Sequence, residues 1–383
     1  MYQILNDLIV LDLTNVLAGP FCTYHLAMMG ANVIKIERPG YGDLSRKLGS
    51  DTKLNQNLLG SSFLAQNAGK KSVILDLKNE GDLEKFYKLI TKADIVVENF
   101  KPGTTKRLKI DYDILSNLND QIIYCSISGF GQYGQLSNKV AYDQIIQGLS
   151  GVMSLNGTKE TNPIRCGFPI CDTVGGLTAT MAILAALYFR IKNRKGIYID
   201  ISMFDAMLPM LGWAASNLLI GGKKPELLGN DNFTASPSGT FITKDGLINI
   251  AANEDKQWIN LCVAIERKDL ITDKRFIGRE KRKKNRASLN KILNETLKKH
   301  TTNFWIKLFD KYDIPCGEIL DLPHVFQLNH TKEREMLIPI YLDYLGRVIN
   351  IINIAPKFSG VKKIPTTPPP TLGEHSEVIL NNL

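Results

Sequence analysis

Residues 8–40, LIVLDLTNVLAGPFCTYHLAMMGANVIKIERPG, decide the fold class. The stretch begins with the apolar run LIVLDL at 8–13 and ends with VIKIE at 33–37, and both runs have the length of a strand. Between them, a Gly-Pro turn at 19–20 leads into a segment of helical character. A strand, a helix and a second strand in this order predict a crossover unit with parallel strands.

The same alternation continues through the first half of the chain. In residues 80–92, apolar side chains repeat at helical spacing, and further helices are expected from about Thr173 and near 204–219. The other strand-like runs lie at 72–77, 95–98, 121–128 and 196–203. We therefore expect an α/β protein with a Rossmann-like large domain of parallel strands and helices.

The sequence changes character after Gly221, where GGKKPELLGN is typical of a linker. Residues 239–252 predict a hairpin around Asp245-Gly246, followed by a helix from Asp255, the basic stretch 274–286 and two helices up to Tyr312. A strand is expected at 347–354, and the prolines of 365–370 predict an extended tail. The predicted domains are a large domain over 1–220, a small α+β domain over 221–328, and a C-terminal segment over 329–383 that returns to the large domain.

Composition limits the possible classes of protein. Hydrophobic residues make up 44% and charged residues 22% of the 383 residues, which is typical of a folded globular protein. The six cysteines have no C-x-x-C spacing and form no cluster with zinc-ligand spacing, so we expect reduced thiols and no metal site. The N-terminal residues lack the basic region of a signal peptide, which favours a cytoplasmic protein.

One uncharged segment, residues 173–189, is apolar but shorter than the roughly 20 residues that cross a bilayer, so it predicts a core helix and no membrane anchor. The net charge of +9 favours anionic partners. Nucleic acid, a phosphorylated small molecule and an acidic substrate all satisfy that condition.

The segment GFPICDTVGGLTA, residues 167–179, is the strongest candidate for chemistry. Asp172 follows a proline-containing turn and is expected to open an apolar helix, where the helix dipole and backbone amides would surround its carboxylate. Gly175 and Gly176 would let another backbone or a ligand approach closely. From these residues alone, Asp172 is either a helix cap or a functional carboxylate.

Cationic side chains also recur where predicted strands begin or end. Arg38 and Arg46 follow the second strand, Lys70 and Lys71 precede the third, and Arg107 lies after the fourth. In doubly wound proteins, ligands bind outside the carboxyl ends of the strands. The recurrence therefore favours an anionic ligand at this edge, although each cation alone is typical of a solvated surface.

Several blocks of sequence, in order, resemble the class III coenzyme A-transferases, a family that includes formyl-CoA and carnitine CoA-transferases and is related to α-methylacyl-CoA racemase. They are VLDLTNVLAGP, GANVIKIERPGYGDLSR, NAGKKSVILDLK, ADIVVENFKPG, YCSISGFGQYG, YDQIIQGLSGVMSLNG, CDTVGG and GIYIDISMFDAML. The similarity runs from about residue 8 to 215 and resumes at 239–252, at 314–326 and in PPPTLGEHSEVIL at the C-terminus.

This resemblance implies roles for particular residues. Asp172 would be the nucleophile that forms aspartyl anhydride and aspartyl-CoA intermediates, with Tyr142 near the thioester. Asn15 and Leu17 would lie at the acid substrate, and the apolar Leu17 makes oxalate and formate poor candidates. The positions expected to contact coenzyme A are Val16, Ala18, Arg38, Lys70, Asn99, Phe100, Arg107 and Met203.

The resemblance also implies an acyl-CoA thioester and a small carboxylic acid as substrates, no permanently bound cofactor, and an interlocked homodimer without nucleic acid or membrane. A short dicarboxylate is our hypothesis for the acid, with succinyl-CoA as donor and itaconate or mesaconate as acceptor. The glycine-rich loop that some members have after the hairpin is absent from IAANEDKQW at 250–258, so no mobile glycine lid is expected.

Three other functions were weighed. A racemase would need a histidine in the block matching 141–145, where this chain has Tyr142, and a phenol of pKa about 10 is a poor base at neutral pH. A nucleic-acid-binding protein would use the basic stretch 274–286, yet no stacking aromatics accompany it. A dehydrogenase would need a G-x-G-x-x-G motif after the first strand, and NVLAGP lacks that spacing.

Overall fold

A computed structural model describes residues 1–383, and its contacts divide the chain into two units. Unit 1 comprises Met1–Ser154, Arg165–Lys223 and Asn329–Leu383, and unit 2 comprises Leu155–Ile164 and Lys224–Leu328. The division near residue 223 lies close to the boundary predicted at 221, whereas the ten residues 155–164 of unit 2 had been placed in the large domain. The C-terminal segment belongs to unit 1.

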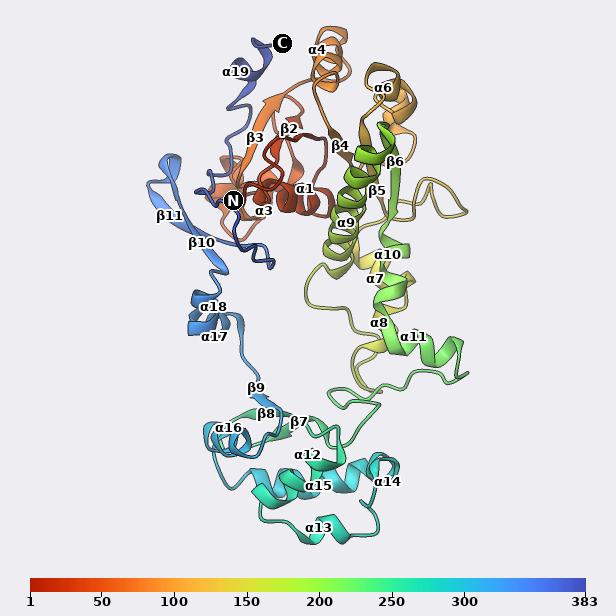
Figure 1. The fold of residues 1–383 in the computed structure, drawn as a ribbon, viewed down its shortest axis with the longest axis vertical. Helices are drawn as coiled ribbons and strands as arrows, with labels where there is room; N and C mark the ends of the chain where they lie inside the picture. The colour runs from red at the N-terminus through yellow and green to blue at the C-terminus, as the bar shows by residue number, and fades with distance from the viewer. The chain divides into compact units, whose positions relative to one another are not determined.

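Unit 1 is built on a six-stranded parallel sheet of order β3-β2-β1-β4-β5-β6, as the alternating sequence predicted (Figure 1). The strands are β1 (Ile9–Asp12), β2 (Asn32–Glu37), β3 (Lys70–Ile74), β4 (Ile95–Glu98), β5 (Ile123–Ser128) and β6 (Ile197–Ser202). A separate antiparallel pair joins β10 (Leu337–Leu342) and β11 (Arg347–Ile352), the second of which matches the strand expected at 347–354.

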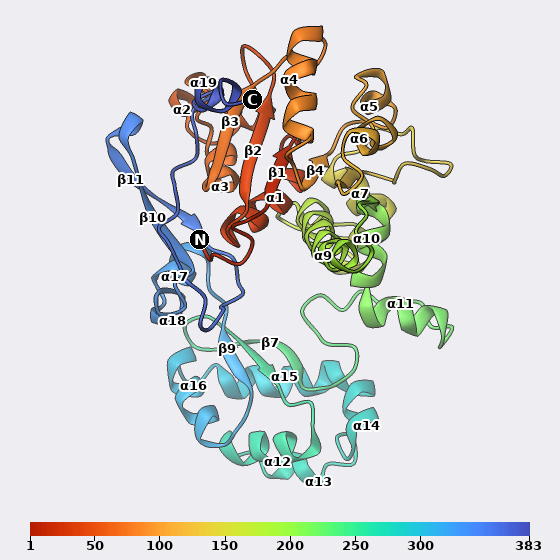
Figure 2. The same cartoon turned by 45° about the horizontal axis from the view of Figure 1, so that its top comes forward.

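Helices cover both faces of the parallel sheet (Figure 2). Alternate strand residues explain this, because Val10 and Val33 pack in one hydrophobic cluster with α1 and α9, whereas Leu11 and Ile34 pack in another with α4 and α6. The principal helices are α1 (Ala18–Met28), α3 (Ser61–Asn67), α4 (Glu80–Ile90), α6 (Tyr112–Leu118), α7 (Asp143–Leu149), α9 (Ile170–Asn193), α10 (Met203–Met210) and α11 (Gly212–Leu219). The shorter ones are η1 (Leu44–Lys47), α2 (Thr52–Gln56), α5 (Thr104–Arg107), α8 (Val152–Leu155), α18 (Asn329–Glu333), η2 (Asp343–Leu345) and α19 (Ser376–Leu380).

The C-terminal segment of unit 1 is bound to the N-terminus of the chain and to β3. The Met1 ammonium donates to the carbonyl of Ile364, and the backbone of His375 donates to the carbonyl of Ser72 in β3. Residues 365–370 are outside any helix, as their prolines predicted.

Unit 2 has its own hydrophobic core around Phe241, Trp258 and Trp305. Its sheet contains β7 (Ser238–Ile242), β8 (Leu247–Ala251) and β9 (Cys316–Glu318), and the antiparallel β7–β8 pair is the hairpin predicted around Asp245-Gly246. Its helices are α12 (Asp255–Ala264), α13 (Asp269–Thr272), α14 (Arg279–Lys284), α15 (Arg286–Leu297), α16 (Thr302–Lys311) and α17 (Leu322–Gln327).

Helix α9 differs from the expected core helix in length and in burial. It has 24 residues and passes by length and composition as a possible membrane span, but its Gly176 and Ile183 face packs inside unit 1. Only 39% of its most apolar 18-residue window is buried. The opposite face carries an exposed apolar stripe of Leu177, Met181, Leu184, Tyr188 and Ile191.

Candidate active site

The candidate site begins where the order of the sheet reverses. Strand β1 lies between β2 and β4, so the loops that leave β1 and β4 diverge and open a crevice at the carboxyl edge. Asn15, after β1, and Asn99, after β4, tie the two loops together. The backbone N–H of Asn15 donates to Asn99 Oδ1 at 2.8 Å, and Asn99 Nδ2 donates to the backbone carbonyl of Asn15 at 2.8 Å. Two predicted site residues therefore shape the crevice together.

A cavity of about 490 Å³ occupies this edge of the sheet. Arg38 and Phe100, both expected to contact coenzyme A, line it, and Lys78 adds a second cation from the segment after β3. The Arg38 guanidinium lies over the Tyr41 ring, 4.4 Å from its centre, so this aromatic ring holds the exposed cation at the rim. The other lining residues are Leu13, Thr14, Asn15, Ile36, Glu37, Pro39, Gly42, Asp43, Leu75, Asp76, Leu77 and Leu108. Its walls therefore combine two cations with three carboxylates, two aromatic rings and several aliphatic side chains.

Lys70 lies elsewhere, and its burial argues against the expected contact with the nucleotide. The strand β3 begins at Lys70, two residues before the predicted start, so the side chain is 2% exposed inside the fold. Its ammonium donates to Asp12 at 3.0 Å, to Thr23 at 2.8 Å and to the Pro20 carbonyl at 3.1 Å. Burial lowers the pKa of Lys70 to about 8 even though Asp12 opposes the change. Lys78, which the sequence reasoning missed, lines the cavity in its place.

The turn between β1 and α1 carries three further predicted residues, Val16, Leu17 and Ala18. Val16 has a positive φ of 67°, a conformation that a β-branched residue rarely adopts. Leu17 precedes α1 as its N-cap, and Ala18 is the first residue of the helix. The amides of Leu17, Ala18 and Gly19 donate to no group in the protein, so this turn has free donors for a ligand. Arg107 is exposed beside Leu108 at the cavity wall.

Asp172 lies in the first turn of α9, as the third helical residue, because the helix starts at Ile170 with Pro169 at the cap position. The expected start at Thr173 and the role of Asp172 as the cap are therefore wrong. Four residues later on the same face, Gly176 contacts α1, where an added Cβ would lie 2.5 Å from the Ala18 carbonyl oxygen. Asp172, the candidate nucleophile, thus lies one helical turn before the point where α9 crosses the beginning of α1.

Met203 lies against the same first turns of α9. A Cβ added to Gly175 would be 2.9 Å from Met203 Cγ, so the absence of a side chain at Gly175 admits this buried methionine. The pair Gly175-Gly176 therefore serves close packing with α10 on one side and α1 on the other. The sequence left two roles open for these glycines, the close approach of another backbone and that of a ligand. At Gly176 the structure contains the first, because the backbone of α1 lies against it.

Asp143, a residue that the sequence reasoning did not select, caps α9 from another helix. Its Oδ1 accepts the backbone N–H of Cys171 at 2.8 Å and that of Asp172 at 3.4 Å, while its Oδ2 accepts Gln147 Nε2 at 2.7 Å. Burial, and then the negative charge of Asp143, raise the pKa of Asp172 to about 7. The backbone amides that were expected to surround the Asp172 carboxylate are therefore engaged by Asp143 instead.

Tyr142 immediately precedes Asp143 and occupies the N-cap position of α7. Its side chain is 67% exposed, which places the phenol at the surface of unit 1 and not in a packed core. The next residue, Asp143, accepts the Asp172 N–H, so it is the backbone of Tyr142 that lies close to the start of α9. No group of His, Cys, Asp and Glu side chains has the arrangement of a metal site.

The sequence matches a known family over nearly its whole length. The model of CoA-transferase family III matches residues 5–376. The chain therefore belongs to CoA-transferase family III. This assignment makes it a CoA-transferase, an enzyme whose substrates are CoA thioesters.

Curated and solved relatives of this CoA-transferase agree with the assignment. Human succinyl-CoA:glutarate CoA-transferase is 33% identical over 374 residues, which are 98% of this chain and 84% of that protein. Acetyl-CoA:oxalate CoA-transferase of Acetobacter aceti is 39% identical over 334 residues, 87% of this chain and 85% of that one. The crystal structure of a CAIB/BAIF family protein from Brucella suis has a TM-score of 0.87 and 33% identity, and covers 100% of both chains.

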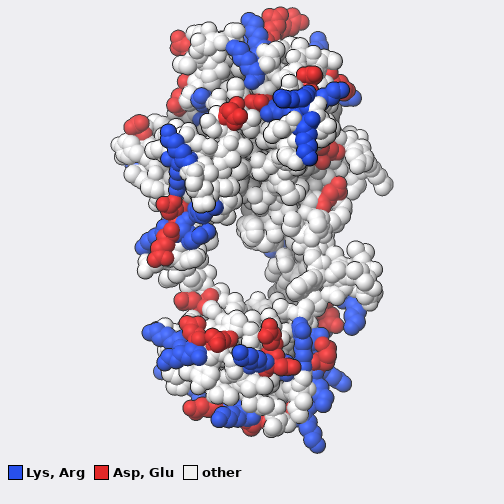
Figure 3. Space-filling model, in the orientation of Figure 1, with Lys and Arg blue, Asp and Glu red and all other residues white.

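The basic stretch 274–286, on which the nucleic-acid alternative depended, is partly engaged inside unit 2 of this CoA-transferase. Arg275 pairs with Asp273, Arg282 is buried and donates to Asp255 at 2.6 Å, and Arg286 donates to the Ala235 carbonyl. On the face shown in Figure 3, acidic side chains are interspersed among the basic ones. Several cations of the stretch 274–286 are therefore engaged in contacts within unit 2.

Proposed function

We propose that this CoA-transferase moves CoA from succinyl-CoA to a short dicarboxylic acid through covalent intermediates on Asp172. One observation carries the proposal. Asp172 is a half-buried carboxylate on the α9 face that meets α1, and α1 begins at the turn bordering the nucleotide cavity. A CoA molecule held by Arg38 and Lys78 would enter that crevice with its phosphates at the two cations.

The chemistry of each step balances without another reactant. The Asp172 carboxylate attacks the thioester carbonyl, the C–S bond breaks, and CoA thiolate leaves an acyl-aspartyl anhydride. The thiolate then attacks the Asp172 carbonyl of the anhydride, releasing succinate and forming aspartyl-CoA. The acceptor carboxylate attacks this thioester to give a second anhydride, and the returning thiolate produces the new acyl-CoA and restores Asp172.

Every attack passes through a tetrahedral oxyanion that needs hydrogen-bond donors. The amides of Cys171 and Asp172 face Asp143, so they are not available for this task. The free amides of Leu17, Ala18 and Gly19 at the start of α1 are the better donors. Because the N-terminal end of a helix also favours negative charge, this end of α1 would stabilise an oxyanion beside Asp172.

The substrate class follows from the relatives and from Leu17. The two curated relatives act on glutarate and oxalate, both dicarboxylates, with succinyl-CoA and acetyl-CoA as donors. Leu17 adds an apolar side chain to the turn that we assign to the acid, which favours an acceptor with a hydrocarbon chain between or beside its carboxylates, such as glutarate, mesaconate or itaconate, over oxalate.

We also propose that the enzyme is a homodimer. The apolar stripe on α9 includes Met181, which is 66% exposed, and Ile191, which is 70% exposed. A continuous exposed stripe of this kind marks an interaction surface. A second copy of the chain is the occupant that the family resemblance favours.

Mass spectrometry tests the covalent mechanism. The enzyme is incubated with succinyl-CoA, trapped with hydroxylamine, and digested; the proposal expects a hydroxamate on the peptide containing Asp172 and none in the Asp172→Asn variant. Acceptor turnover is then compared for glutarate, mesaconate, itaconate, oxalate and carnitine. No adduct, together with deuterium exchange at the α-carbon of a 2-methylacyl-CoA in heavy water, would replace this proposal with the racemase.

A further inference from the structure

The backbone at Val16 is the most unusual feature of the nucleotide cavity's edge. Its φ of 67° lies in the left-handed region, where the two γ-methyl groups of valine crowd the backbone. Such a residue keeps its conformation only where its surroundings impose it. The question is therefore which groups impose this conformation on a turn that connects a strand with the start of α1.

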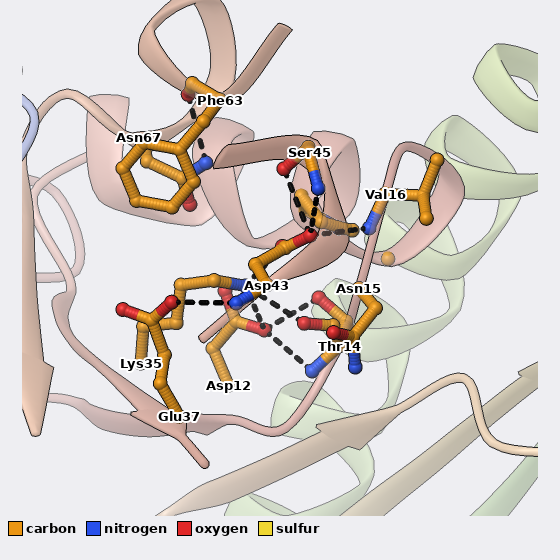
Figure 4. Close-up of polar contacts among 12 residues, drawn as sticks. Asp12, Thr14, Asn15, Val16, Lys35, Glu37, Asp43, Ser45, Phe63 and Asn67 are labelled. Atoms are coloured by element: carbon orange, nitrogen blue, oxygen red, sulfur yellow. Dashed lines mark hydrogen bonds and ion pairs between the residues drawn. The ribbon is translucent and has the colours of Figure 1, made fainter. Parts of the chain in front are cut away.

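Side chains from other parts of the sheet edge hold Thr14, Asn15 and Val16, the residues that lead into the turn. Lys35, on β2, donates from Nζ to the Thr14 carbonyl at 2.7 Å. Asn99 holds both backbone groups of Asn15, as described above. Asp43 accepts the Val16 N–H through Oδ1 at 3.0 Å. The chain is thus fixed at three successive residues, and Figure 4 shows Asp43 and Lys35 beside them.

Asp43 is itself fixed by charge and by hydrogen bonds. Its Oδ2 lies 2.9 Å from the Lys35 ammonium, and both side chains are fully buried. Its Oδ1 also accepts the amide and the hydroxyl of Ser45, each at 2.8 Å. Burial would raise the pKa of Asp43, but Lys35 and the amide donors hold it below its usual value, so the carboxylate stays charged. The carboxylate is therefore a rigid acceptor aimed at Val16.

We propose that Asp43 is a positioning residue for coenzyme A, which holds Val16 in the left-handed conformation and so sets the direction of the Val16–Gly19 turn. Asp43 touches no reacting atom in this assignment. It acts by keeping the free amides of Leu17 to Gly19 and the Val16 side chain where the thioester end of the ligand would lie. The inference rests on the proposed function of the cavity as the CoA site.

A purely structural role for the same buried charges predicts a different result. If Asp43 served only to neutralise Lys35, its loss would lower stability, and the conformational preference of residue 16 would not matter. If Asp43 positions Val16, a glycine at 16 removes the need for it, because glycine adopts positive φ without steric cost. The coupling between positions 43 and 16 therefore separates the two roles.

The experiment is a double-mutant cycle with Asp43→Asn, Val16→Gly and their combination, measured by calorimetric titration of the full-length enzyme with free CoA and by thermal unfolding. Asp43→Asn is expected to raise the Kd for CoA about tenfold, equivalent to about 1.4 kcal/mol. In the Val16→Gly background the same substitution should change the Kd less than about threefold, while the melting temperature falls as much as in the wild-type background. Lys109→Gly, at another residue of positive φ (58°), is the matched control and should restore nothing.

A milder change covers the case in which Asp43→Asn does not fold. Ser45→Ala removes one of the three donors to Asp43 Oδ1 and leaves every charge in place. It should raise the Kd for CoA about twofold to threefold, and this increase should disappear in the Val16→Gly background. Equal losses of affinity with valine or glycine at 16 would overturn the positioning role. Failure of the wild-type enzyme to bind CoA would instead overturn the proposed function, and Arg38→Ala separates these outcomes because it weakens binding without involving Val16.

Discussion

The raised pKa of Asp172 leads to a pH dependence that can be measured. Only the carboxylate form attacks a thioester, so kcat/KM for succinyl-CoA is expected to rise with pH and to level off above about 7, the pKa of Asp172. Below that value the rate should fall about tenfold per pH unit. The displacement from 3.8 to about 7 is about 3 units, and at 1.36 kcal/mol per unit it represents about 4 kcal/mol of unfavourable ionisation.

Replacing Asp143 separates the two causes that raise the pKa of Asp172, which are burial and the negative charge of Asp143. Burial is the larger cause and the charge of Asp143 the smaller, so Asp143→Asn should move the acidic limb of the profile to lower pH by less than half of the displacement. The amide oxygen of the new side chain still accepts the Cys171 N–H, so the start of α9 stays capped. Asp113→Asn, at an acid on α6, is the matched control and should leave the limb in place.

The assay is a steady-state profile of kcat/KM between pH 5 and 9, followed by the formation of the new acyl-CoA. A wild-type limb near pH 4 would show that Asp172 is not desolvated in the working enzyme. A limb that stays at 7 in a correctly folded Asp143→Asn variant would show that the two carboxylates do not interact, and the geometry at the start of α9 would then not explain the reactivity of the nucleophile.

The other predictions concern stability, binding and assembly. Asp172→Asn should abolish transfer and raise the free energy of unfolding at pH 8 by at most about 4 kcal/mol, because it removes a buried ionisation; the gain should shrink between pH 7 and 4 and vanish below, as urea titrations at several pH values would show. Arg38→Ala should raise the Kd for CoA about tenfold in calorimetry, since it removes a phosphate-binding fork. Lys70→Met, in contrast, should lower the melting temperature by leaving the buried Asp12 with one cation fewer, with little direct effect on CoA contacts. Met181→Asp should turn a dimer into monomers in light scattering, and a monomeric wild-type enzyme would refute the proposed assembly.

The sequence alone predicted most of the elements of unit 1, because its strands are buried on both faces and therefore appear as continuous apolar runs. The six strands lie within a few residues of the predicted runs, and the hairpin of unit 2 follows from Asp245-Gly246. The start of β3, two residues before the predicted one, has a specific cause. Lys70 and Lys71 look like a solvated loop, but the Lys70 ammonium is paired inside the fold by the carboxylate of Asp12, 58 residues earlier, and by Thr23 and the Pro20 carbonyl.

The residues of the candidate site were predictable where a local pattern marks them, and not where a distant partner defines them. Asn99 and Phe100 directly follow a strand, so their place at the cavity could be expected. Asp143 could not be found in this way, since its role at the start of α9 depends on backbone amides 28 and 29 residues away. Lys78 was within reach of the same reasoning that selected Arg38, because it too follows a strand at the edge where ligands bind.

Two unfavourable local states in unit 1 occur at residues assigned to the candidate site. Val16 has a backbone that valine avoids, and Asp172 has a carboxylate whose ionisation is opposed by burial and by Asp143. Either state would relax if its surroundings gave way, so the buried ion pair of Asp43 with Lys35 and the close helix packing at Gly176 have to hold them. Asp172→Asn, which relieves one of these states, should therefore stabilise the fold and abolish turnover, and a gain in stability at position 172 without loss of turnover would separate the unfavourable ionisation from function.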